Sequence, residues 1–402
     1  MLRSFRLGNH RSFRDEQELL LMPALPGDSR PVVPVAAVYG ANASGKSNLL
    51  DGLYTMRQLV RSDLRSTTLE EGCLQQPFRL DPASKAKGST FVVELVLSGT
   101  PYTYGFVVAR DEVMEEWLYS YPEKRKRLLF ERQGRIVKFG STVADVKAKL
   151  ELLEEMVRPD ALFLSLCRQL AIGPLVPVFD WFRSGMRMPS TARFSRHIHR
   201  SVSSYLSNGD TARLRRMVAL LQAADVGIVD LEVNEVSRSV GLRDDQVMTQ
   251  REVVLLHGDT REPFDLHEES SGTRNWLALL PAVLEVLDSG SLLVVDEIDA
   301  SLHPLLTAKL VGLFADERIN AQHAQLVFTT HDTSLLGTML GDQVLERDQV
   351  WFVERNAAGA SELYPLTDFK PRNDQNIERR YLGGSYGAVP VLGDFFEAAV
   401  RK

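Results

Sequence analysis

Residues 40–47 read Gly40-Ala41-Asn42-Ala43-Ser44-Gly45-Lys46-Ser47, which fits the phosphate-loop pattern G-x-x-x-x-G-K-[ST] in full. The pattern predicts a short apolar strand at 34–39 before this stretch and an amphipathic helix at about 47–60 after it. Glycines let the backbone curl so that its N–H groups point at phosphate oxygens, and the helix N-terminus adds partial positive charge. The stretch therefore predicts a nucleotide site. Lys46 would reach the β- and γ-phosphates of ATP, and the Ser47 hydroxyl would bind Mg²⁺.

The residues predicted to contact the nucleotide at this loop are Gly40, Asn42, Ala43, Ser44, Gly45, Lys46, Ser47 and Asn48.

A second predicted strand ends in two acids. Residues 291–295 form an apolar run, typical of a parallel-sheet strand buried on both faces, and Asp296 and Glu297 follow it. Such a strand places Asp296 at the carboxyl edge of the sheet, where ligands bind in α/β folds. We expect Asp296 to hold the Mg²⁺ shell through water. Glu297 points differently and can polarise the attacking water.

Three further motifs surround this strand. Glu269-Ser270-Ser271-Gly272-Thr273-Arg274 stands upstream at a predicted helix start, residues 298–304 follow the strand directly, and Thr329-Thr330-His331-Asp332 ends the next strand. Each motif alone has an ordinary explanation, such as a helix cap at 270–273 or a structural role for His331. Their order and spacing behind a full phosphate loop favour a shared nucleotide site.

This set of motifs resembles the ABC-type ATPase heads shared by SMC proteins, recombination ATPases and the overcoming-lysogenisation-defect nucleases. In those heads a Walker A loop, a signature helix, a Walker B strand, a D-loop and a switch histidine occur in this order. The resemblance covers nearly the whole chain and implies that ATP is bound between two heads. The signature reads S-S-G-T at 270–273 where transporters have L-S-G-G-Q. The residues matched outside Walker A are Ser270 and Gly272 of the signature, Asp296 of Walker B, the catalytic Glu297, Asp299 of the D-loop and the switch residue His331.

Heads of this kind also place a glutamine that senses Mg²⁺ and the γ-phosphate between the first helix and the antiparallel sheet. Gln75 and Gln76 stand at about that place. We assign Gln76 as the ligand of nucleotide and Mg²⁺, with an ordinary polar loop residue as the alternative. Arg11, in the polar segment at 9–14, is a further candidate for a nucleotide contact.

The remaining pattern predicts an α/β fold, namely an ABC-ATPase head with a mixed or parallel core sheet, an antiparallel β subdomain and a helical insertion. Period-two alternation from 76 to 140 indicates the antiparallel sheet, and a helical period indicates the insertion. We expect three parts: 1–140 and 226–402 as the two portions of the head, and 141–225 as the insertion. Further predicted strands are 3–7, 16–22, 91–97, 102–108, 228–233, 252–257, 325–330 and 349–354, and further predicted helices are 143–156, 161–170, 176–184, 211–223, one from about 271, 304–314 and 333–340.

Charge disfavours a globally basic nucleic-acid binder. The chain has 47 Lys and Arg against 53 Asp and Glu, a net charge of −6. A local basic face remains open, because Arg193, Arg196, His197, His199 and Arg200 cluster within the insertion. A solvated loop is the ordinary explanation of this cluster, and a contact with nucleic acid or a partner is the other.

Composition indicates an ordinary globular protein, since 44% of the 402 residues are hydrophobic and 25% are charged. No apolar run reaches the roughly 18 residues of a membrane-spanning helix. The first residues lack a signal peptide's apolar core, so we expect a cytoplasmic protein with no membrane partner. Cys73 and Cys167 are the only cysteines, too few for a disulfide scaffold or a zinc site.

Within this class the overall pattern most resembles the AbiLi/RloA-like ATPases of abortive-infection and anti-phage defence loci. The stretches that carry this similarity are 9–13, 270–273, 347–354 and the glycine-rich tail 381–390. The similarity implies a homodimer or higher even oligomer. It would act as the sensor or regulatory ATPase of a separate, nuclease-like effector, with nucleic acid or a phage component as trigger.

Two absences narrow the class. No sustained heptad supports an SMC coiled coil, and no D-x-D after His331 supports a nuclease domain. Two alternatives stay open: a DNA-repair or recombination clamp, and a nucleotide-bound scaffold with little turnover.

Overall fold

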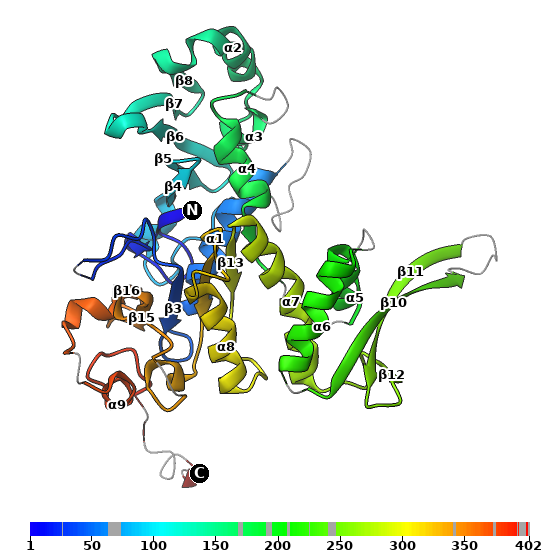
Figure 1. Ribbon diagram of the computed structural model, residues 1–402. Helices are drawn as coiled ribbons and strands as arrows, with labels where there is room; N and C mark the ends of the chain where they lie inside the picture. The colour runs from blue at the N-terminus through cyan, green and yellow to red at the C-terminus, as the bar shows by residue number, and fades with distance from the viewer. Residues whose placement is uncertain are drawn as a thin grey trace.

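The computed structural model describes residues 1–402 except 26, 63–73, 168–171, 190–194, 207–209, 225, 240–246, 341–342, 373–374, 392, 394–398 and 401–402. Cys73 and Arg193 therefore lie outside the described residues. The fold is α/β, as predicted, and Figure 1 shows its parts: a central sheet, an antiparallel sheet above it in the view, and a helix pair with a long hairpin to its right.

The central sheet has six strands in the order β16-β15-β3-β14-β13-β9. β3, β13, β14, β15 and β9 run parallel, and β16 pairs antiparallel with β15. Every residue of β3, β13 and β14 is buried, as their continuous apolar sequences predict. The bounds are β3 Val35–Tyr39, β9 Met186–Arg187, β13 Leu292–Val295, β14 Gln325–Thr329, β15 Val350–Arg355 and β16 Ser361–Pro365.

Two hydrophobic cores lie on the two faces of this sheet. Alternate residues of β3 divide between them, with Ala36 and Val38 in one core and Ala37 and Tyr39 in the other. The first core includes α1 (Lys46–Arg61) and the antiparallel sheet. The second includes α7 (Ser271–Ser289) and α8 (Pro304–Ala315). The sheet is thus covered on both faces, which fixes the loops at its carboxyl edge.

The antiparallel sheet has seven strands in the order β2-β1-β4-β5-β6-β7-β8 and confirms the predicted β subdomain. Its first strands form the expected hairpin around 9–14, where His10 and Phe13 make an isolated bridge. The bounds are β1 Leu2–Gly8, β2 Gln17–Leu20, β4 Ser89–Leu97, β5 Thr100–Ala109, β6 Glu112–Ser120, β7 Arg127–Gln133 and β8 Ile136–Phe139.

The segment 141–225 packs in two directions. Residues of α2 (Lys147–Met156), α3 (Phe163–Cys167) and α4 (Val176–Ser184) join the first core, beside the antiparallel sheet. Residues of α5 (Ser195–Tyr205) and α6 (Thr211–Ala223) join the second core, beside α7. The division of the chain into three parts at 140 and 225 stays a prediction.

The loop expected around Arg196 and Arg200 is wrong, because these residues lie in α5. Ile198, Val202 and Tyr205 are buried at helical spacing, so the segment is an amphipathic helix whose charges face outward. His199 Nδ1 accepts a hydrogen bond from the Val253 N–H at 2.8 Å, which ties α5 to the long hairpin.

That hairpin consists of β10 (Ile228–Ser239) and β11 (Val247–His257), with β12 (Glu262–Asp265) as a third strand. Figure 1 shows it projecting from the body beyond α5 and α6.

The helix predicted at 333–340 is also wrong. Residues Thr333–Leu336 form one 3-10 turn, η5, and Gly337 is extended. Glycine is a poor helix former, so Gly337 weakens any continuation of the turn, and it lies close to the Glu378 side chain of α9 (Ile377–Leu382).

Candidate functional site

The phosphate loop joins β3 to α1 and requires glycine at both ends of its turn. Gly40 has a φ of 156° and Gly45 a φ of 119°, and L side chains rarely adopt such values. A Cβ at Gly45 would lie 2.2 Å from Ser361 Oγ and 2.7 Å from Ser12 Oγ. The loop is therefore held by close backbone packing, while Asn42 and Ala43 at its crest are exposed.

Lys46 folds its side chain back over this loop. Its Nζ donates hydrogen bonds to the carbonyl oxygens of Gly40 at 2.8 Å and Ala41 at 3.1 Å. Burial lowers the pKa of Lys46, and the nearby carboxylates of Asp296, Glu297 and Asp299 oppose that shift. The Lys46 ammonium is therefore a buried positive charge at the phosphate loop, near three carboxylates.

Asp296 contacts Ser47, which is another of the predicted Mg²⁺ ligands. Its Oδ1 accepts hydrogen bonds from Ser47 Oγ at 3.1 Å and from Thr329 Oγ1 at 2.6 Å. Ser47 is the second residue of α1, Asp296 follows β13 and Thr329 ends β14, so three central elements meet at one oxygen. Hydroxyl and carboxylate oxygens are the ligands that Mg²⁺ prefers.

The Glu297 side chain is exposed next to Asp296, and two hydrogen bonds fix the Glu297 backbone. The Glu297 N–H donates to Thr329 Oγ1 at 2.7 Å, and the Glu297 carbonyl accepts from the Ala300 N–H at 2.9 Å. Its φ of 52° lies in the left-handed region, which is uncommon for a residue other than glycine. Such backbone strain persists where surrounding contacts fix a turn, and strained turns of this kind cluster at functional sites.

Asp299 and His331 lie together as neighbouring turns. The His331 N–H is 3.4 Å from Asp299 Oδ2, and Asp299 Oδ1 is buried without a hydrogen-bond partner among the described residues. The His331 side chain is exposed. The structure thus brings the predicted D-loop and switch residues next to each other.

Ser270 and Gly272 lie at the N-terminus of α7, next to the turn at 299–301. Ser270 caps the helix, its Oγ accepting from the Thr273 N–H at 3.0 Å. A Cβ at Gly272 would lie 2.7 Å from the Ser301 carbonyl oxygen, and Asn275 Nδ2 donates to the Ala300 carbonyl at 2.8 Å. The start of α7 and residues 299–301 therefore form one packed unit.

The two candidate glutamines differ. Gln75 is buried, and its side chain donates to the Lys87 carbonyl and accepts from the Arg110 N–H, in the loops next to β4 and β5. Gln76 is exposed, and its carbonyl accepts from the Arg11 N–H at 2.7 Å. No hydrogen bond of the described residues joins the Gln76 side chain to Ser47 or Asp296.

Arg11 is tied to helix α1. Its Nε lies 2.5 Å from Asp51 Oδ2, and the buried His10 contributes Nε2 at 2.8 Å to the same oxygen. Asp51 lies one turn after Ser47 on α1. The hairpin at 9–14 is therefore fixed to the helix that follows the phosphate loop.

Ser12 and Ser361 support the loop but carried no sequence signal. Ser361 Oγ hydrogen-bonds Ser12 Oγ at 2.7 Å and the Ser44 carbonyl at 2.5 Å. The predicted Asn48 donates its Nδ2 to Ser12 Oγ at 2.7 Å, so this side chain braces the loop from below. Thr329 was also missed as a site residue, although its place just before His331 at a strand end was visible.

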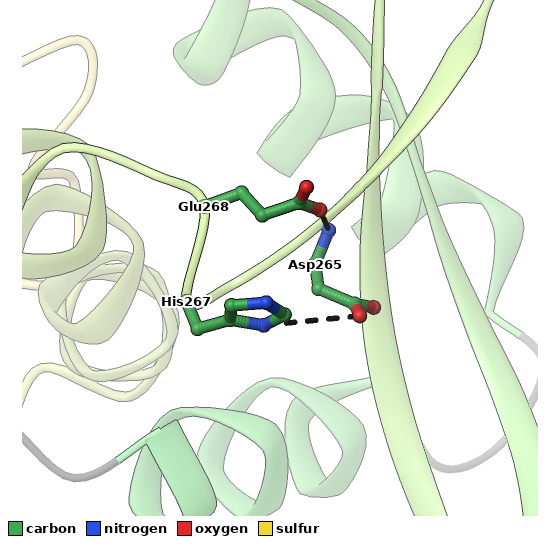
Figure 2. Close-up of side chains that lie close together, drawn as sticks. All are labelled: Asp265, His267 and Glu268. Atoms are coloured by element: carbon green, nitrogen blue, oxygen red, sulfur yellow. Dashed lines mark hydrogen bonds and ion pairs between the residues drawn. The ribbon is translucent and has the colours of Figure 1, made fainter.

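A separate group of side chains lies in the turn that precedes α7 (Figure 2). Asp265 N–H donates to Glu268 Oε2 at 2.8 Å, and His267 Nδ1 lies 3.8 Å from Asp265 Oδ2. All three residues are exposed, and their closeness follows from the turn itself. We assign them no part in the nucleotide site.

A helix long and apolar enough to cross a membrane does not occur within the described residues.

Solved structures with a similar fold include SMC heads. The SMC head domain from Thermotoga maritima is 14% identical, with 90% of this chain and 98% of that chain covered and a TM-score of 0.42. An SMC head bound to the C-winged helix domain of ScpA is 13% identical over 90% and 96%, with a TM-score of 0.44. An SMC head with an extended coiled coil, bound to the C-terminal domain of ScpA from Pyrococcus furiosus, is 11% identical over 92% and 97%, with a TM-score of 0.41.

The curated proteins contain no match to this sequence. One family model does match, over residues 35–337, which span the phosphate loop, the signature segment, the two acids after β13 and His331. The chain therefore belongs to the family described as "AAA domain, putative AbiEii toxin, Type IV TA system".

Proposed function

We propose that this chain is a Mg²⁺-dependent ATPase whose heads pair around ATP in the ABC manner. The observation that carries the proposal is the convergence of Ser47 and Thr329 on Asp296 Oδ1, because it joins the phosphate-loop hydroxyl to the acid of the second strand. Lys46 supplies a buried cation at the same loop. These are the groups that phosphoryl transfer requires.

The donor set fits Mg²⁺ and ATP. Ser47 and Asp296 offer hard oxygen ligands 3.1 Å apart, and bound Mg²⁺ would neutralise phosphate charge. Lys46 and the loop N–H groups would bind the phosphates, and Glu297 would orient the attacking water and accept its proton at the carboxylate. Residues 40, 42–45 and 48 complete the cradle. We keep Gln76 as a candidate Mg²⁺ ligand. Its exposed side chain would have to turn toward Ser47 and Asp296.

The second half of the site would come from another copy of the chain. Ser270 and Gly272 of one head would bind the γ-phosphate held by the other, with Asp299 and His331 sensing that phosphate. The packed unit of α7 and residues 299–301 supports this, since it presents the signature segment and the D-loop as one surface.

The cellular role that we propose is regulatory. The family description names a toxin of a toxin–antitoxin system, and the sequence resembles the AbiLi/RloA-like ATPases of anti-phage defence. We propose that ATP-driven pairing of the heads controls a separate, nuclease-like effector in response to a nucleic acid or phage component. Protection of bacteria that carry the native locus should be lost with Lys46→Ala, measured as phage plating efficiency.

The mass of the protein in solution tests the ATPase proposal directly. We expect Glu297→Gln to bind ATP, to release phosphate at least about 10-fold more slowly than wild type and to accumulate as a dimer with ATP and Mg²⁺. The measurements are light scattering after size exclusion and phosphate release. Glu317→Gln, an exposed acid on another surface, is the matched control and should behave as wild type.

Wild-type turnover by Glu297→Gln would reject the role of Glu297. An oligomer that ignores nucleotide would reject head pairing and favour a scaffold.

A further inference from the structure

The long hairpin ends in a histidine that contacts the residue just before the signature segment. His257 is the last residue of β11, and its Nε2 lies 2.6 Å from Glu269 Oε1. Because an ionised carboxylate only accepts hydrogen bonds, this nitrogen is the donor. Glu269 directly precedes Ser270, the N-cap of α7. A hydrogen bond therefore joins the base of the hairpin to the start of the helix that carries the signature segment.

The position of His257 is set by its strand and by a neighbouring ring. In the three-stranded sheet, His257 pairs with Ile228 of β10 on one side and with Glu262 of β12 on the other. Its ring lies 4.7 Å from the Phe264 ring, with 49° between the two planes. The histidine thus offers its Nε2 from a position that three strands define.

The Glu269 carboxylate is almost fully enclosed. Its side chain is 7% exposed, against 22% for the His257 side chain. The structure gives this carboxylate no hydrogen-bond partner other than His257 within the described part of the chain. Loss of the histidine donor would leave a buried charge without a partner, which is unfavourable, so the carboxylate would turn to other donors within reach.

The first N–H groups of α7 are the donors that the proposed γ-phosphate contact needs. Ser270 accepts hydrogen bonds from two of them, at its Oγ from the Thr273 N–H and at its carbonyl from the Arg274 N–H. The Ser271 and Gly272 N–H groups have no acceptor among the described residues. Open N–H groups at a helix N-terminus attract anions. A phosphate and a side-chain carboxylate would therefore compete for them.

We propose that His257 is a positioning residue for the signature segment: it holds the Glu269 carboxylate, so that the Ser271 and Gly272 N–H groups stay open for the γ-phosphate bound by the other head. This inference rests on the proposed head pairing and adds a residue from outside the ATPase motifs. Without the histidine, the carboxylate would be released next to the N-terminus of α7. It would occupy these donors and repel the incoming phosphate.

The test separates the donor from the charge that it controls. All variants are made in the Glu297→Gln parent, and the dissociation constant of the dimer with ATP and Mg²⁺ is measured by analytical ultracentrifugation. His257→Phe keeps a ring and removes the donor, and it should weaken the dimer about 10-fold. Adding Glu269→Gln removes the charge as well and should restore pairing to within about threefold of the parent.

Two control variants and two further readouts accompany this comparison. His257→Gln keeps a donor on its side-chain amide and should pair like the parent. His267→Ala should do so too, because His267 is an exposed histidine of the neighbouring turn (Figure 2). The affinity of the unpaired head for a fluorescent ATP analogue should stay within about twofold in every variant, because the phosphate loop forms the other half of the site. The thermal midpoint reports whether each variant folds.

Unchanged pairing in His257→Phe would overturn the inference. A loss of pairing that Glu269→Gln does not restore would overturn it too, because the histidine would then serve only the fold of the hairpin. Should His257→Phe not fold, Glu269→Gln alone decides: pairing at least as tight as in the parent supports the inference, and clearly weaker pairing refutes it. A parent that binds the analogue but stays monomeric with ATP refutes head pairing itself, and with it the role of His257, whatever the variants do.

Discussion

Asp296 is the residue on which the site converges. One of its oxygens accepts hydrogen bonds from Ser47 and Thr329, which come from the phosphate-loop helix and from the strand before His331. Lys46 lies close enough for Asp296 to oppose the lowering of its pKa by burial. A single carboxylate thus links the cation, the hydroxyl ligand and the turn that carries His331.

At this scale we predict that Ser361→Ala loosens the phosphate loop. The change removes a buried hydroxyl bonded to the Ser44 carbonyl and to Ser12, and it leaves that carbonyl without its partner. The free energy of unfolding should fall by about 1–3 kcal/mol, and ATP should bind more weakly. Chemical denaturation and nucleotide titration measure the two effects.

Ser141→Ala is the control for that change, since Ser141 is exposed and should leave both quantities within error. Full stability and affinity in Ser361→Ala would show that Ser12 and Asn48 hold the loop without it.

Whether a helix could be predicted from the sequence depends on how clearly its apolar residues recur at helical spacing. Helix α6 has the bounds 211–223 that the sequence predicts, because its apolar period is clear and Asp210 caps it. Helix α5 was missed because its charges obscure the buried positions Ile198 and Val202. The η5 turn ends at Leu336, and the next residue, Gly337, is extended because glycine favours no helical backbone there.

We predict that the outer part of the β10–β11 hairpin is dispensable for nucleotide binding. Val236 pairs with Gln250, so residues 237–249 can be replaced by a two-residue Asn-Gly turn in register. No predicted site residue lies on this hairpin. The ATP affinity should therefore stay within about twofold of wild type in a fluorescence titration, because the change removes no predicted site residue.

Val253→Ala provides the contrast, because Val253 is fully buried at the base of the hairpin and its truncation should lower the unfolding free energy by about 1–3 kcal/mol. Loss of ATP binding on shortening the hairpin would mean that this arm acts on the site.

The whole molecule is organised around one sheet with a core on each face. β3, β13, β14 and β15 contribute residues to both cores, so neither core can open without exposing the sheet that delivers the phosphate loop and Asp296. In Figure 1 the antiparallel sheet extends upward from this centre and the long hairpin extends to its right.

Because the cores share the sheet, we predict that ATP with Mg²⁺ stabilises the molecule as a unit. At a ligand concentration of 100 times Kd, binding adds about 2.7 kcal/mol to the unfolding free energy. Calorimetry should show a single transition that moves to higher temperature. Lys46→Ala should abolish the shift, since it removes the cation at the loop. Two transitions of which only one moves would show that the cores unfold separately.

The sequence by itself determined the phosphate loop, the apolar central strands and the acids that follow one of them. These follow from local patterns, because a parallel strand buried on both faces must be apolar throughout and must end where polar side chains meet ligand. Only the tertiary structure decided which distant residues support the loop. Ser12 and Ser361 meet although they are 349 positions apart, and the Tyr381 ring contacts Tyr39, directly before Gly40, from near the other end of the chain. Such contacts leave no periodic signal, because packing complementarity between remote segments selects them.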